Sequence, residues 1–241
     1  MKAKNFFSAG VVLAMVFTFS CSSSDDDSGG GGDKGNDIGN YKTVVIGTQT
    51  WMAENLNYAV AGSKCYGEGG EVAIGYDEEG VPTSTTTLSM VEVQANCDKY
   101  GRLYDWATAM ALPPSCNENS CSNQIQPKHK GICPSGWHIP SSDDFVILIG
   151  YVGETSGTKL KTESGWNENG NGTNEFGFSA LPGGVGSGGY FGFVGNIGLW
   201  WCVGEGGSDD AYIRINYDGN EIAHWNSGGR SNLFSVRCLK D

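Results

Sequence analysis

The stretch PSSDDFVILIGYVG, residues 140–153, carries the clearest local signal in the chain. Ser141 and Asp144 have the spacing of a capping box, in which each side chain bonds to the backbone N–H of the other residue. Acidic residues in the first turn suit the helix dipole, and Gly153 is a typical residue just past a helix end. The stretch therefore predicts a helix over residues 142–152.

Four segments before this helix also have interpretable patterns. Residues 41–51 form a β-rich run interrupted by a Gly-Thr turn, which indicates a hairpin. Residues 62–87 are rich in Gly, Glu and Thr, and we expect an exposed excursion there. Apolar spacing predicts a helix over residues 88–100, and a second over residues 105–112, where Asp105 is a suitable N-cap.

Short strands separated by Gly and Asn follow the central helix. The pair Asp218-Gly219 indicates a tight hairpin turn between the third and the fourth of them. Because helices come first and a meandering antiparallel sheet follows, the predicted fold class is α+β, with two or three short helices. The expected strands lie around residues 176–181, 198–203, 211–216, 221–226 and 235–239.

The composition indicates a loop-rich globular domain with an aromatic core. The chain of 241 residues has 38 Gly, but it also has 7 Trp, 10 Tyr and 10 Phe. Low-complexity disordered segments lack such aromatic residues. The formal net charge of −12 argues against nucleic acid as a partner and against direct adhesion to anionic lipid, because either needs a basic patch.

The N-terminus has the layout of a secretory signal. Lys2 and Lys4 precede an apolar run of about 15 residues, which is too short to span a bilayer as a helix. The run ends at Ser20, and Cys21 after it resembles the lipobox of bacterial lipoproteins, in which this cysteine carries the lipid. Thr18 replaces the usual Leu of that motif, so an ordinary signal peptide followed by a structural cysteine is the alternative.

The chain is therefore expected to have three parts. Residues 1–20 form a lipoprotein signal peptide, residues 21–40 an acidic Gly/Ser/Asp tether, and residues 41–241 a single domain. The run from Ser24 to Asp27 resembles the acidic export signal of some outer-membrane lipoproteins, and a solvated spacer is the alternative. A lipid with more than one chain gives stable membrane attachment. The expected location is the outer membrane, exposed at the cell surface.

The cysteines indicate a disulfide framework. Eight are present, and the seven that follow Cys21 form an odd set, so at least one stays unpaired. A metal site is the alternative, but there is no Cys-x-x-Cys pair, and the histidines are not grouped with cysteines in a zinc-like pattern. The seven are Cys65, Cys97, Cys116, Cys121, Cys133, Cys202 and Cys238.

Six sequence blocks occur together in a fixed order. They are WMAENLN (51–57), YGRLYDW (100–106), CPSGWHIPS (133–141), GTNEFGFSALPGG (172–184), LWW (199–201) and FSVRC (234–238). Together they resemble the Fibrobacter succinogenes major paralogous domain, a family of exported bacterial proteins, over residues 41–241. The resemblance implies a surface or secreted protein, and it names no ligand.

A second resemblance is weaker. Residues 138–145 and 236–238, with the order of helices and strands, look like parts of the C-type-lectin-like fold. The formylglycine-generating enzymes are a catalytic branch of that fold. The resemblance implies a C-type-lectin-like α+β domain in which a Cys133–Cys238 disulfide would join the second half to the last strand. Cys65–Cys97 and Cys116–Cys121 are the other expected pairs.

Cys202 is then left as a free thiol. A buried small residue beside Trp201 and a reactive thiol are the two alternatives. A formylglycine-generating-like enzyme would need a paired-cysteine site, and no second cysteine lies near Cys202 in the sequence. No catalytic residue is therefore assigned.

The late loops carry the candidate ligand-binding residues. C-type lectins hold Ca²⁺ with Asn, Asp and Glu oxygens, and such hard ligands suit Ca²⁺. No Glu-Pro-Asn, Gln-Pro-Asp or Trp-Asn-Asp triplet occurs, so no metal site is carried over and no cofactor is assigned. Polar turn residues and core tryptophans are the alternative interpretation. The candidates are Trp200, Trp201, Asp209, Asp210, Tyr212, Asn216, Asp218, Asn220 and Trp225.

The sequence therefore predicts a lipid-anchored surface protein with a non-catalytic binding or adhesion domain. The expected partners are the membrane, through the N-terminal lipid, and a glycan or a partner surface protein. A structural or tip-like subunit of a surface assembly is the alternative, and a formylglycine-generating-like enzyme is the third hypothesis.

Overall fold

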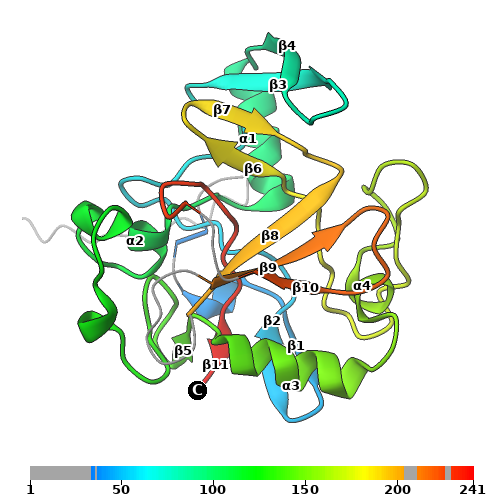
Figure 1. Cartoon of the computed structure of the whole chain (residues 1–241). Helices are drawn as coiled ribbons and strands as arrows, with labels where there is room; N and C mark the ends of the chain where they lie inside the picture. The colour runs from blue at the N-terminus through cyan, green and yellow to red at the C-terminus, as the bar shows by residue number, and fades with distance from the viewer. Residues whose placement is uncertain (1–33, 36, 204–210, 226–228) are drawn as a thin grey trace, which may run out of the picture. The chain divides into compact units, whose positions relative to one another are not determined.

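The computed structural model describes residues 34–35, 37–203, 211–225 and 229–241 (Figure 1). The residues from 34 onward belong to one unit, and their fold is α+β, as the sequence predicts. The helices are η1 (Ile38–Asn40), α1 (Met90–Tyr100), α2 (Trp106–Ala109), η2 (Pro114–Asn117), η3 (Ser122–Gln124), α3 (Ser142–Val152) and α4 (Ser156–Leu160). The strands are β1 (Thr43–Ile46), β2 (Gln49–Met52), β3 (Glu71–Tyr76), β4 (Pro82–Thr86), β5 (Trp137–His138), β6 (Val185–Ser187), β7 (Tyr190–Gly192), β8 (Ile197–Cys202), β9 (Ala211–Asn216), β10 (Ala223–Trp225) and β11 (Leu239–Lys240).

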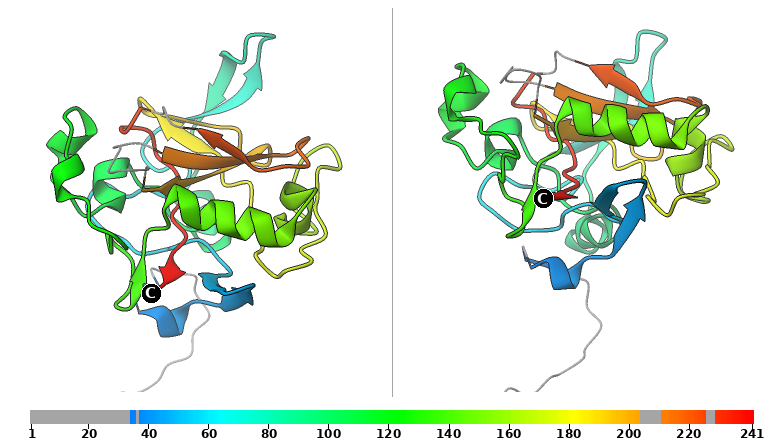
Figure 2. Two further views of the ribbon diagram at one scale, coloured as in Figure 1. Left: turned by 60° about the horizontal axis from the view of Figure 1, so that its bottom comes forward. Right: turned by 90° about the horizontal axis from the view of Figure 1, so that it is seen from below.

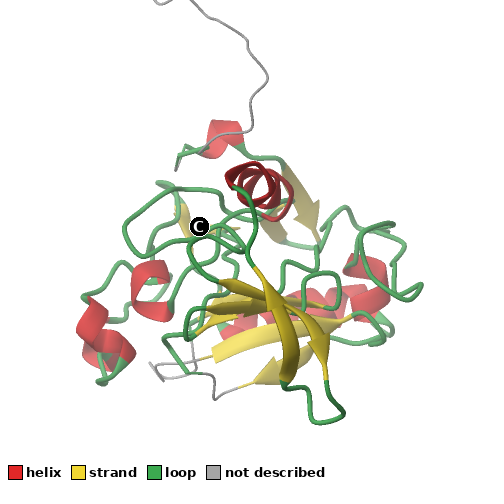
Figure 3. Cartoon of the chain, turned by 90° about the horizontal axis from the view of Figure 1, so that it is seen from above, coloured by secondary structure: helices red, strands yellow, loops and turns green. Residues whose placement is uncertain are grey.

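The described strands form three small sheets joined by long loops (Figure 3). Their strand orders are β1-β2-β11-β5, β10-β9-β8 and β4-β3-β7-β6. In the first sheet the C-terminal strand is an inner strand, because Leu239 is the partner of both Trp51 on β2 and His138 on β5. The first and last parts of the domain are therefore joined within one sheet.

Helix α3 confirms the prediction for residues 142–152. Ser141 accepts a hydrogen bond from the backbone of Asp144, whose side chain accepts one from the backbone of Ser141. The inner side of the helix is buried, while Val146, Ile147 and Tyr151 are exposed. The antiparallel pairing of β1 with β2 confirms the hairpin expected over residues 41–51. Figure 2 shows α3 beside this hairpin.

The hairpin and the helix meet at a glycine. Gly47 lies in the turn between β1 and β2 with φ +61°, and a Cβ there would lie 2.8 Å from the ring of Tyr151. Only glycine combines this left-handed backbone with so close an approach.

Several expectations about secondary structure were wrong. The strand expected over residues 235–239 is reduced to β11, and the described residues contain four α-helices instead of two or three. The excursion over residues 62–87 contains the paired strands β3 and β4, of which β4 is polar and exposed, whereas β3 buries Val72 and Ala73. The strand expected over residues 176–181 is reduced to a single bridge between Lys161 and Ala180. Helix α4 was not expected, since it has five residues and no side-chain hydrogen bond from its own N-cap, Thr155.

Strand β8 lies between two hydrophobic cores, and all six of its residues are buried. Leu199 and Trp201 belong to a core with α2, whereas Trp200 and Cys202 belong to a core with α3 and α4. Alternate residues of a strand point to opposite faces, so consecutive apolar residues fill both cores.

The disulfides are the three expected pairs, Cys65–Cys97, Cys116–Cys121 and Cys133–Cys238. Cys202 is free and fully buried, as the non-reactive alternative requires. No helix in the described part of the chain has the length and apolar character needed to cross a bilayer.

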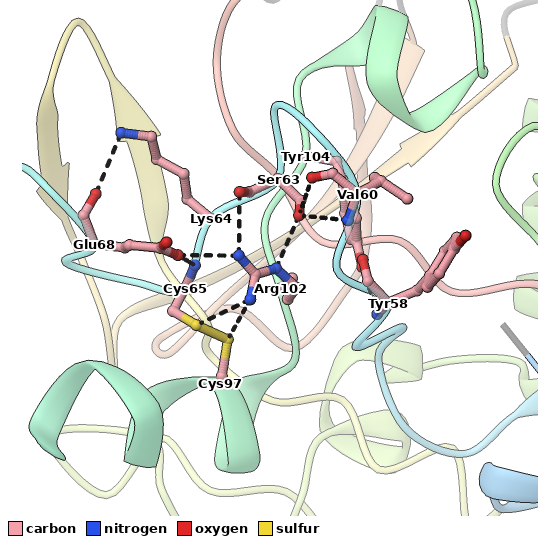
Figure 4. Close-up of polar contacts among 9 residues, drawn as sticks. All are labelled: Tyr58, Val60, Ser63, Lys64, Cys65, Glu68, Cys97, Arg102 and Tyr104. Carbon is pink, nitrogen blue, oxygen red and sulfur yellow. Dashed lines mark hydrogen bonds and ion pairs between the residues drawn. A yellow bond between two sulfur atoms is a disulfide. The ribbon is translucent and has the colours of Figure 1, made fainter. Parts of the chain in front are cut away.

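Arg102 supports the first disulfide (Figure 4). Its Nε donates to Ser63 Oγ at 2.8 Å, and its Nη2 donates to Glu68 Oε2 at 3.0 Å. Its Nη1 lies 3.5 Å from Cys65 Sγ and 3.7 Å from Cys97 Sγ. One guanidinium group thus ties the loop before β3 to the end of α1.

Candidate functional site

Two of the predicted ligand-binding residues were assigned wrongly. Trp200 and Trp201 are each 0% exposed, because β8 is covered on both faces, and neither ring can stack on an external ligand. Trp200 Nε1 donates to Asn55 at 2.8 Å, and Trp201 Nε1 donates to the carbonyl of Tyr104 at 2.7 Å. Asp209, Asp210 and the side chain of Trp225 lie outside the described residues.

Tyr212 and Asn216 on β9 are half-buried. The Tyr212 ring packs against Phe234 at a centroid distance of 4.9 Å, so this residue borders the core. Asn216 Oδ1 accepts a hydrogen bond from Arg214 Nε at 2.6 Å. Both side chains make contacts within the fold, and neither lines the hollow beside the β9–β10 turn, so the ligand role of these two residues stays a prediction.

Asp218 and Asn220 are exposed and line a hollow of about 430 Å³ between the β9–β10 turn, α4 and the loop that follows α4. The sequence indicated these two residues but not those that complete the site. The lining residues are Thr158, Lys161, Glu168, Asn169, Gly170, Asn171, Tyr217, Asp218 and Asn220. We define this set as the turn hollow.

Lys161 holds the β9–β10 connection in place at the turn hollow. Its side chain is nearly wholly buried, and its Nζ donates to the carbonyls of Tyr217 at 2.9 Å, Gly219 at 3.1 Å and Asn216 at 3.3 Å. The ammonium also lies 5.2 Å from the centroid of the Trp166 ring. Burial lowers the pKa of Lys161, and the negative charge of Asp218 opposes this effect. Three backbone carbonyl oxygens of the β9–β10 connection therefore already have a cationic partner, the ammonium group of Lys161.

Close backbone packing fixes the loop over residues 166–172. A Cβ at Gly170 would overlap the carbonyl oxygen of Tyr217, and one at Gly172 would overlap that of Thr158. Glu168 and Asn169 adopt left-handed backbone with φ of +50° and +61°. Asparagine adopts this region readily, whereas a glutamate there persists where the surrounding structure holds it, so the packing of the loop fixes the backbone at Glu168.

A second contact ties α4 to the turn. Glu221 accepts hydrogen bonds from the backbone of Thr155 at 2.6 Å and from Ser156 Oγ at 2.9 Å, and so caps the N-terminus of α4. The backbone bond from Thr155 is the main reason that the pKa of Glu221 is lowered. Helix α4 thus contacts the β9–β10 connection at both ends, through Glu221 and Lys161 (Figure 1).

The turn hollow has an acidic rim. The charge of Glu168, followed by that of Asp218, raises the pKa of the Tyr217 hydroxyl, which is therefore protonated at neutral pH. The remaining lining groups are mostly amides and hydroxyls. Asn169 and Asn171 are exposed, whereas Thr158 is half-buried and its hydroxyl donates to Asn220 Oδ1 at 3.1 Å. Planar amides and carboxylates beside a tyrosine can bond a ligand rich in hydroxyl groups while one face of that ligand packs on the ring.

A second hollow, of about 540 Å³, lies at the start of α3. Its histidines are already engaged: His138 Nδ1 lies 2.8 Å from Asp241 Oδ1, and His129 Nε2 lies 2.9 Å from the carbonyl of Met110. Burial raises the pKa of Asp144, but hydrogen bonds from His138 and Ser141 outweigh burial and leave this pKa below its usual value. These groups tie α3 to the C-terminal strand, so we assign this cluster a structural role.

The sequence blocks of the resemblance meet in the core, around Arg237. This arginine is 0% exposed, and its Nη2 and Nε donate to Asn55 Oδ1 at 2.7 and 3.2 Å. Its guanidinium also donates to the carbonyls of Phe178 and Ser179. Burial lowers the pKa of Arg237 to about 9, and Glu54 opposes this effect. Asn55 Nδ2 also donates to the carbonyl of Tyr100. Five of the six blocks, those containing Asn55, Tyr100, Phe178, Trp200 and Arg237, thus share one buried polar network.

Cys202 lies beside this network and does not have the environment of a reactive thiol. Its Sγ lies 3.8 Å from Ser142 Oγ. Burial raises the pKa of the thiol to about 12, so it is protonated at neutral pH. Among the described residues, no group of three or more His, Cys, Asp or Glu side chains has the arrangement of a metal site.

Comparison with known proteins agrees with the six blocks. Residues 44–240 match the model of the family described as the Fibrobacter succinogenes major domain. No curated protein and no solved structure matches the chain significantly. The match covers most of the 241 residues and includes every described strand from β2 to β11. The chain belongs to the Fibrobacter succinogenes major domain family.

Proposed function

We propose that the protein is a lipid-anchored binding domain that presents a saccharide site, the turn hollow, at the cell surface. The observation that carries this proposal is the composition of the hollow, in which amides, carboxylates and hydroxyls surround Tyr217. Saccharides offer many hydroxyl groups and an apolar ring face, which match these side chains. The C-type-lectin-like fold and the outer-membrane location belong to the same proposal.

Lys161 makes calcium unnecessary at this site. Three carbonyl oxygens that would suit a hard cation face its ammonium, at distances of 2.9 to 3.3 Å. A ligand therefore meets a turn that is already fixed. We expect saccharide binding to persist in the presence of a chelator.

A saccharide array tests the binding site. Tyr217→Ala is expected to weaken binding about tenfold or more, because it removes the ring face and the hydroxyl from the hollow. Tyr151→Ala is the matched control, since Tyr151 is 60% exposed on α3 and does not line the hollow. Binding constants for the best saccharide would be measured by calorimetry with and without chelator. Absence of binding to every saccharide class would contradict the proposal.

The lipid anchor has its own test. Cys21→Ala is expected to move the protein from the detergent phase to the aqueous phase in phase partitioning, because no thiol remains to carry the lipid. Ser22→Ala, at the adjacent residue, is the control and should stay in the detergent phase. Partitioning of Cys21→Ala with the detergent would overturn the anchor and the location inferred from it.

A structural subunit of a surface assembly is the second candidate function. The exposed apolar side chains of α3, Val146, Ile147 and Tyr151, favour it, together with Val45 on β1. Exposed apolar residues of this kind are found where proteins associate. Co-purification of a fixed protein partner, without saccharide binding, would support this function instead.

A further inference from the structure

Strand β4 carries a run of hydroxyl groups at the open edge of its sheet. The order β4-β3-β7-β6 leaves β4 paired on one side only (Figure 1). Every residue from Val81 to Thr87 is exposed, and each of the five residues 83–87 is Ser or Thr. Exposed segments rich in Ser and Thr that also contain proline are typical acceptors of O-linked sugars. This run lies outside the turn hollow and plays no part in the function proposed above.

Strand β3 has a glycine opposite two of these hydroxyls. Ser84 is the partner of Gly75 in the strand pairing, and register shifts lie on both sides of Gly75. A Cβ at Gly75 would lie 2.8 Å from Thr83 Oγ1 and 3.0 Å from Ser84 Oγ. These distances are too short for a real Cβ, so only glycine at this position lets the hydroxyls of both Thr83 and Ser84 pack this closely against β3.

The hydroxyl of Thr85 is in a different situation. Its Oγ1 donates to Glu71 Oε2 at 2.8 Å across the strand pair. That bond fixes the rotamer of Thr85 and engages its proton. The structure thus distinguishes Thr83 and Ser84 from their neighbour on the same strand.

A hollow of about 580 Å³ adjoins these hydroxyls. Residues 81–85 line it together with Glu71 and Tyr190, whose ring is 51% exposed. A sugar ring attached to β4 has a tyrosine face and the side chain of Val81 to pack against. The attachment point and a surface for the attached group therefore lie together.

The open edge of the sheet gives a physical reason for attaching a sugar to β4. An open edge strand can pair with another chain, and proteins commonly block it with charged side chains. Residues 82–86 contain no charged residue, and Ile74 and Val81 nearby are 62% and 56% exposed. A bulky hydrophilic group on Thr83 or Ser84 would keep a second strand away.

We propose that Thr83 and Ser84 are sites of O-linked glycosylation. In this reaction a hydroxyl oxygen attacks the anomeric carbon of a diphosphate-activated sugar, bound by a glycosyltransferase of the producing cell. The new bond joins Thr83 Oγ1 or Ser84 Oγ to that carbon, and the bond from the carbon to the diphosphate oxygen breaks. The hydroxyl proton passes to a base of the transferase, and the diphosphate leaves.

Mass spectrometry of the protein purified from its natural producer tests this proposal. The peptide that contains β4 is expected to carry a mass increment of one or more sugars, and fragmentation that preserves side-chain bonds should place it on Thr83 or Ser84. The double variant Thr83→Ala/Ser84→Ala should lose the increment. Thr85→Ala is the matched control and should retain it, because the Thr85 hydroxyl is held by Glu71.

Two results would overturn the proposal. One is a β4 peptide of unmodified mass in the wild-type protein, with complete sequence coverage. The other is an increment that maps to Thr85 or that survives in the double variant. Thermal unfolding of each variant would show that the fold is retained, which we expect since all three side chains are exposed.

Discussion

Replacing Asn55 with leucine is expected to lower the free energy of unfolding by about 3–5 kcal/mol. Asn55 Oδ1 accepts from Trp200 Nε1 at 2.8 Å and from two nitrogens of Arg237, at 2.7 and 3.2 Å. Its Nδ2 donates to the carbonyl of Tyr100 at 2.8 Å. Leucine has a similar size but cannot accept or donate, so it leaves a buried cation and an indole N–H without this partner.

Such a loss is large beside the total stability of a domain, which is about 5–15 kcal/mol. Urea unfolding of the purified variant would measure it. Asn119→Leu is a suitable control because Asn119 is exposed and donates only to the carbonyl of Ser115, and its cost should stay near 0.5 kcal/mol. Asn55→Asp should be less costly than Asn55→Leu, since a carboxylate still accepts from Arg237. Equal stability of Asn55→Leu and the wild type would refute the role of this network.

Removal of the Cys133–Cys238 disulfide is expected to cost about 4.7 kcal/mol, the loop-closure value for a loop of about 100 residues. The two cysteines are 105 residues apart, and the bridge secures the segment before β5 to the C-terminal strand. The double variant Cys133→Ala/Cys238→Ala would be compared with the wild type by guanidinium unfolding.

The short Cys116–Cys121 disulfide provides the matched comparison. Its cysteines are only 5 residues apart, so the same relation gives about 2 kcal/mol for Cys116→Ala/Cys121→Ala. We therefore expect the long-range variant to unfold at a clearly lower guanidinium concentration than the short-range variant. Equal losses would show that restriction of the unfolded chain is not the main contribution of these bridges.

Local signals in the sequence were sufficient for the elements that stabilise themselves. Helix α3 begins with a reciprocal capping box and ends at Gly153, and all of these contacts lie within a few residues. Helix α4 is the opposite case. The residue that caps it, Glu221, lies 65 residues further along the chain, and no local pattern could reveal it.

The candidate site likewise combines residues that local sequence patterns reveal with residues that only the fold brings near. Asp218 and Asn220 were found because they lie between two strands that the sequence predicts, although residues 217–222 form a longer connection than the tight turn expected at Asp218-Gly219. Glu168 and Asn169 come from a loop about 50 residues earlier. The density of Asn and Gly over residues 166–172 was the available signal for that loop. Trp200 and Trp201 were misassigned because a strand between two cores exposes neither of two adjacent aromatic residues.

The inner position of β11 makes the first sheet depend on the C-terminal residues of the domain. Residues 239–240 follow β2 and β5 in the sequence, yet they lie between them in the finished sheet. Until these residues and the adjacent Cys238 are in place, β2 and β5 are not joined, and Cys133 has no partner. Loss of this short strand is therefore expected to disrupt the whole first sheet, and not only the end of the chain.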